Sequence, residues 1–112
     1  MLMKTVWEVL LMMQGDSYNL GIRIENNAGM PVTPADVIDV EITIGHIQKK
    51  YSNASLSYAD GFWLFPVSQS ETFGYLPAAP KAQVRVKWAN GVVEGKPLYG
   101  VRIEESISKE VL

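Results

Sequence analysis

The stretch Asn19-Leu20-Gly21-Ile22-Arg23-Ile24-Glu25 alternates apolar and polar residues along its whole length. Three later stretches repeat the pattern, at 38–44, 83–88 and 99–104, and each ends at a turn signal. Because successive side chains of a β-strand point to opposite faces of the sheet, each stretch predicts a strand with one buried and one wet face. The predicted core positions are Leu20, Ile22, Ile24, Ile38, Val40, Ile42, Ile44, Val84, Val86, Trp88, Tyr99, Val101 and Ile103.

Turn and cap signals separate these stretches. Asn90-Gly91 is the clearest hairpin signal, and Ser68-Gln69-Ser70-Glu71 has the spacing of a helix capping box. The stretch Phe62–Phe65 is apolar on both faces, which predicts a central strand covered on both sides and ended by Pro66. We therefore expect an all-β fold: a small antiparallel sandwich of the immunoglobulin type, with about seven to eight strands and one or two short helical turns.

The length of the chain, 112 residues, fits a single domain, so we expect residues 1–112 to form one sandwich with an unpatterned C-terminal tail at 105–112. Residues 1–13 carry a mostly apolar run that Glu8 interrupts. The run lacks a signal-peptide cleavage pattern and is too short to span a bilayer, so neither a signal peptide nor a membrane span is expected. It is either a first strand or an extension ahead of a start at Met12 or Met13.

Composition argues against several classes of function. The sequence has no cysteine, which excludes disulfides, thiolate metal sites and cysteine nucleophiles. Ten basic and twelve acidic residues are interleaved and give a net charge of −2, so there is no basic stripe for nucleic acid. His46 is the one histidine and has no nucleophile beside it, and Asp36, Asp39 and Glu41 lack the dense acidic loop that calcium needs. We expect no catalytic residue, metal site or cofactor, and no enzyme.

The aromatic residues raise the alternative of a carbohydrate-binding or adhesion module. Trp63 and Trp88 fall at predicted core positions, where large side chains fill a small sandwich. Tyr75, next to Gly74 in a loop, is the aromatic residue most expected to be exposed. We therefore predict ligand or partner contacts at Tyr75 and at two wet-face bases, Arg85 and Lys87. The sugar-binding alternative requires Tyr75, Tyr58 and the tryptophans to share an exposed groove.

Three segments carry a resemblance to a known class of domain: Gln14-Gly15-Asp16-Ser17-Tyr18 before a strand, Gly29-Met30-Pro31-Val32 before the next, and 83–88 followed by Asn90-Gly91. Their order resembles the immunoglobulin-like domains of tail and baseplate proteins from phages and prophages of Gram-positive bacteria, notably the N-terminal domain of baseplate upper proteins. The sequence ends soon after the predicted sandwich, whereas those proteins continue into a long C-terminal extension. The resemblance therefore implies an accessory or adaptor role.

The resemblance implies a structural, non-enzymatic protein that is made in the bacterial cytoplasm and resides in the virion. Its expected partners are other phage structural proteins. An interface on a virion domain normally repeats around a symmetry axis, so a homo-oligomer or a ring-like assembly with a partner is also expected. Neither nucleic acid nor a membrane is an expected partner.

Overall fold

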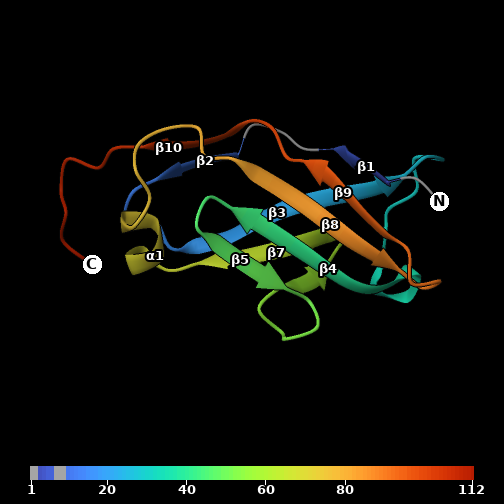
Figure 1. The fold of residues 1–112 in the computed structure, drawn as a ribbon. Helices are drawn as coiled ribbons and strands as arrows, with labels where there is room; N and C mark the ends of the chain where they lie inside the picture. Colours follow the sequence, from blue (N-terminus) through green and yellow to red (C-terminus); the bar gives the residue numbers. More distant parts are fainter. Residues whose placement is uncertain (1–2, 7–9) are drawn as a thin grey trace.

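Two four-stranded sheets face each other in the computed structural model of the chain (Figure 1). The structure describes residues 3–6 and 10–112, with side chains from residue 11 onward, so Trp7 lies outside the described residues. The first sheet has the order β1-β3-β7-β6, formed by Met3–Val6, Tyr18–Asn26, Phe62–Val67 and Ser57–Ala59. The second has the order β5-β4-β8-β9, formed by Ile47–Lys50, Val37–Ile44, Ala82–Trp88 and Val93–Pro97.

Strand order identifies the sandwich type. In immunoglobulin lettering, β1, β3, β7 and β6 are strands A, B, E and D, and β5, β4, β8 and β9 are strands C′, C, F and G. The spatial orders A-B-E-D and C′-C-F-G are the immunoglobulin arrangement. The predicted all-β sandwich is confirmed. The described residues form ten strand segments. Besides the two large sheets, β2 (Leu10–Met13) and β10 (Val101–Glu104) form a separate two-stranded sheet.

One strand pair departs from the predicted antiparallel fold. β2 and β10 run parallel, with Leu10 opposite Val101 and Met13 opposite Glu104. A parallel pair needs a long connection, and here the whole sandwich between the two strands provides it. The parallel pair joins a segment near the start of the sequence to one near its end.

The core lies between the sheets and follows the predicted alternation. Leu20, Ile22 and Ile24 of β3 are each no more than 4% exposed. The remaining predicted positions that are buried come from β4, β8 and β10: Val40, Ile42, Ile44, Val84, Val86, Trp88, Val101 and Ile103. Trp63 of β7 is also fully buried, and its indole N–H donates to the carbonyl oxygen of Val32 at 3.0 Å. Trp63 and Trp88 are core residues, as predicted.

Two predicted core residues are exposed instead. Ile38 is 53% exposed because the register of β4 against β8 shifts between Val37 and Asp39. Such a bulge inserts one extra residue and turns its side chain out of phase. Tyr99 is 64% exposed because β10 begins only at Val101, after Gly100 at a φ of +83°. The positive φ breaks the alternation that placed Tyr99 beside Val101.

Two predictions about the strand β7 are also wrong. It is central, but Phe62 is 42% exposed and Leu64 is half-buried, so one face of the strand is covered rather than both. Pro66 lies inside β7, opposite Asn19 of β3, instead of ending the strand. Pairing with β6 stops at Leu64, so the missing proline N–H removes no hydrogen bond to β6.

The turn signals are confirmed. Pro34–Asp36 forms a single 3₁₀ turn between the sheets, and Gln69–Phe73 forms the short helix α1, with the Ser68–Glu71 capping box in place. Asn90-Gly91 lies in the β8–β9 hairpin, where the N–H of Gly91 donates to the carbonyl oxygen of Trp88 at 2.8 Å. Residues 105–112 have no regular structure.

Candidate functional site

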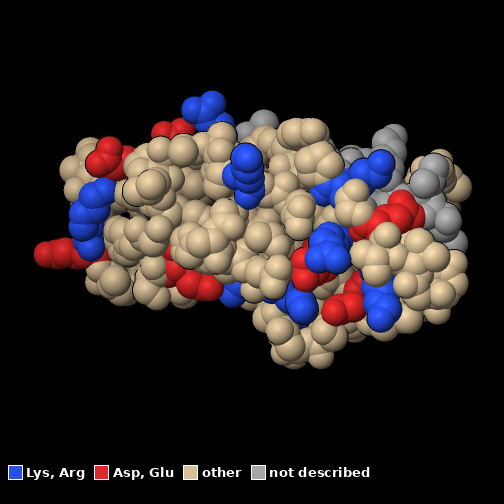
Figure 2. All heavy atoms as spheres, in the orientation of Figure 1, with Lys and Arg blue, Asp and Glu red and all other residues tan. Residues whose placement is uncertain are grey.

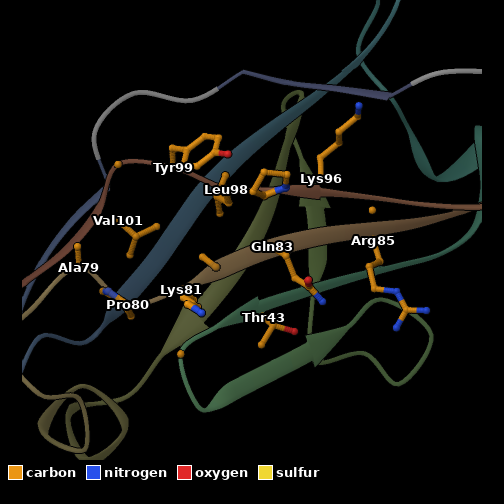
Figure 3. Close-up of a pocket in the computed structure, with 15 residues that line it drawn as sticks. Thr43, Ala79, Pro80, Lys81, Gln83, Arg85, Lys96, Leu98, Tyr99 and Val101 are labelled. Atoms are coloured by element: carbon orange, nitrogen blue, oxygen red, sulfur yellow. The ribbon is translucent and has the colours of Figure 1, made fainter.

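A groove of about 880 Å³ crosses the second sheet near the point where β9 ends (Figure 3). Thr43 of β4 and Gln83 of β8 are register partners on the wet face of that sheet and line it together with Arg85. Figure 3 shows Tyr99 and Lys96 on the opposite side of β8 from Thr43 and Arg85, so the groove runs across the strand.

The local sequence keeps the groove open. Gly95 stands opposite Arg85 in the β8–β9 ladder, where any larger residue would add a side chain over the groove. A Cβ atom built at Gly95 would lie 3.4 Å from Cγ of Arg85. After Pro97, the N–H of Leu98 donates to the carbonyl oxygen of Ala82 at 2.9 Å, and Leu98 is buried. Alternation then directs Tyr99 outward, to the rim of the groove.

The lining of the groove is apolar and basic. Pro80, Pro97, Leu98, Tyr99 and Val101 supply apolar atoms. Its charged residues are Lys81, Arg85 and Lys96, and no acidic side chain of the described residues lines it. The groove therefore combines apolar contact area, amide and hydroxyl groups, and positive charge.

Arg85 is partly neutralised by an acidic side chain, whereas no ion pair involves the two lysines among the residues whose side chains are described. The guanidinium of Arg85 lies 3.5 Å from Oε1 of Glu41, and the same carboxylate lies 3.7 Å from the ammonium of Lys50. Within residues 11–112, neither Lys81 nor Lys96 forms an ion pair. The lysines therefore carry the positive charge that an incoming ligand would meet.

The rest of the wet face is charged but lies outside the groove. Lys87 is exposed and stands opposite Asp39, whose carboxylate accepts hydrogen bonds from Ser52 at 2.7 and 2.9 Å. Figure 2 shows both charge signs gathered side by side over the ends of β4 and β8 nearest the β8–β9 turn. Of the predicted contact residues, Arg85 lines the groove and Lys87 does not.

The prediction that Tyr75 is exposed is wrong, because the residue is 3% exposed. Its hydroxyl donates to the carbonyl oxygen of Ile44 at 2.6 Å, and its ring lies 4.8 Å from the ring of His46. Burial, together with the charge of Glu71, raises the pKa of Tyr75 from 10.0 to about 12. Proximity to Gly74 suggested an open loop, but the tyrosine instead fixes that loop to the end of β4.

The shared aromatic groove required by the sugar-binding alternative is absent for the residues named. Trp63, Trp88 and Tyr75 are buried, and the ring of Tyr58 packs on Trp63 at 5.0 Å. The aromatic residue at the groove is Tyr99, which sequence reasoning placed in the core. Gly100 was the signal that could have found it, because a glycine inside an alternating stretch often marks a break in the strand.

Other kinds of site are not seen in the described part of the chain. Residues 3–6 and 10–112 hold no group of three or more side chains able to bind a metal ion, and no helix long and apolar enough to cross a membrane. In comparisons with known proteins, no family model matches the chain and no curated protein is significantly similar to it.

Proposed function

We propose that the chain is a non-enzymatic protein-interaction module that holds a partner protein in the groove beside Tyr99. The observation that carries the proposal is the lining of that groove: an exposed aromatic ring, apolar atoms and two lysines without an ion pair among residues 11–112. Tyrosine and arginine, which Tyr99 and Arg85 contribute to this lining, are enriched at protein interfaces. The sandwich supplies a rigid support for them.

The partner we propose is a structural protein of a phage, with this chain as a prophage-encoded virion component of the tail or baseplate. The support is the resemblance carried by the segments 14–18, 29–32 and 83–91. An immunoglobulin-type sandwich also agrees with that class of domain, although the fold by itself is shared by proteins of many functions. The protein would be made in the bacterial cytoplasm and reside in the virion.

Co-expression with the products of neighbouring genes tests the proposal. The tagged chain should co-purify with a tail or baseplate protein. Tyr99→Ala and Lys96→Glu should each abolish the complex, whereas Arg102→Glu, an exposed base that does not line the groove, should leave it intact. A complex that survives both groove substitutions would contradict the proposal.

A carbohydrate-binding module is the second candidate, and the exposed ring of Tyr99 in the same groove as the amide of Gln83 favours it. A sugar ring could stack on the tyrosine while its hydroxyl groups bond to the amide. Measurable affinity for a defined glycan on an array, lost in Tyr99→Ala, together with no protein partner, would select this function over the first.

A further inference from the structure

Residues 105–112 leave the sandwich in an extended, irregular form and present apolar side chains to solvent. Ile107 and Leu112 are fully exposed, and Val111 is 65% exposed. Exposed apolar residues scattered singly are ordinary, but here three lie within six consecutive residues, 107–112. No other part of the described chain covers these three side chains.

The segment is held away from the groove of its own chain. The backbone N–H of Ser106 and the ammonium of Lys109 donate to Oε1 of Gln14 at 3.3 and 2.7 Å. Figure 1 shows the segment leaving the sandwich at the end that carries α1, and none of residues 105–112 lines the groove. These bonds fix its direction, so docking into its own groove would require breaking them.

The segment and the groove are chemically complementary. The groove offers apolar atoms with Lys81 and Lys96. The segment offers apolar side chains with Glu105 and Glu110, and its one base, Lys109, is already engaged by Gln14 and lies 3.6 Å from Glu105. Opposite charges on two apolar surfaces favour contact between them and fix its register.

We infer that the 105–112 segment of one copy docks in the groove of a second copy. The inference rests on the proposed interaction function and names one partner for the groove, the chain itself. Each copy would donate a segment and accept another through different surfaces, so the contact is heterologous. Such contacts close into a ring or continue as an open chain of subunits.

A donor–acceptor experiment on the full chain tests this arrangement by sedimentation velocity over a concentration series. The wild-type protein should associate as concentration rises. Ile107→Ser removes an anchor of the donor, Tyr99→Ala removes the rim of the acceptor, and each should weaken association about tenfold or more. Ile38→Ser, which removes an exposed apolar side chain elsewhere on the second sheet, should leave association unchanged.

Mixing the two weakened variants gives the decisive result. Ile107→Ser keeps an intact groove and Tyr99→Ala keeps an intact segment, so an equimolar mixture should form heterodimers that neither variant forms alone. A wild-type protein that stays monomeric, association that persists in both variants, or a mixture that remains monomeric would each overturn the inference. A monomeric protein that still loses a phage partner on Tyr99→Ala would leave the proposed function standing. Unchanged thermal unfolding verifies that both variants are folded.

Discussion

The hydroxyl of Tyr75 donates a 2.6 Å hydrogen bond to the carbonyl oxygen of Ile44 and thereby ties the β7–β8 connection to the end of β4. Both groups are buried, so removing the donor leaves the carbonyl oxygen without this partner. We expect Tyr75→Phe to lower the free energy of unfolding by about 1–3 kcal/mol. Urea denaturation measures the loss. Tyr99→Phe, at an exposed position, should change stability by less than about 0.5 kcal/mol.

The raised pKa of Tyr75 makes this contribution depend on pH. The folded-state pKa, about 12, lies above the ordinary value of 10.0, so the folded state holds the proton more tightly than the unfolded state. The stabilisation is therefore complete below pH 10 and is lost as pH rises through about 12. The stability difference between the wild-type protein and Tyr75→Phe should shrink from pH 8 to 11.5 in paired urea titrations. A constant difference would contradict a buried, proton-retaining Tyr75.

Trp88 ends the buried row of β8, and its indole N–H donates to Oε1 of Glu94 at 2.8 Å. Because the side chain is 2% exposed, Trp88→Ala should cost about 3–5 kcal/mol of unfolding free energy. Trp88→Phe keeps most of the apolar volume and should cost clearly less. A loss below about 1 kcal/mol for the alanine variant would place Trp88 at the surface.

Alanine substitutions at Gly45 and Gly91 distinguish the cost of backbone strain from the cost of a packing clash. Both have positive φ, +59° and +88°, so alanine is strained at either position. A Cβ atom at Gly45 would also lie 2.9 Å from the ring of Tyr75, whereas nothing lies within 4 Å of one at Gly91. Gly45→Ala should therefore destabilise the fold by at least about 1 kcal/mol more than Gly91→Ala. Equal melting temperatures for the two variants would contradict this packing.

Removal of residues 1–11 tests the role of the first strands. The deletion removes β1, which pairs with β3, and half of β2, which pairs with β10, and it makes the fully buried Met12 the first residue. The truncated chain should lose several kcal/mol of unfolding free energy, enough to unfold a marginal domain. A melting transition within a few degrees of the full chain would show that these strands add little.

The alternating strands were predictable because burial of one sheet face imposes a regular pattern on the sequence. Leu20, Ile22 and Ile24 obey the pattern, since β3 runs without a break. Prediction failed at Ile38 and Tyr99, where a bulge and a positive-φ glycine reset the phase. Sequence alternation cannot reveal such a reset, because the residue types on either side still alternate.

The candidate site was less predictable than the fold. Arg85 could be placed on a wet face from its strand alone. The groove itself combines Thr43, Gly45, residues 79–83, Arg85 and residues 95–101, which approach only when β4, β8 and β9 pair. The prediction that Tyr75 is exposed failed for a different reason. The sequence places this tyrosine in a loop but does not reveal the buried carbonyl group to which its hydroxyl donates.

The most direct test of the groove as a docking surface is a dilution series of amide NMR spectra on the ¹⁵N-labelled full chain. If the groove receives the 105–112 segment of another copy, the amide signals of Gln83, Lys96, Tyr99 and Ile107 should shift together with concentration along one saturating curve. Signals that stay unchanged at every concentration, or shifts confined to the outer face of the β1-β3-β7-β6 sheet, would contradict it.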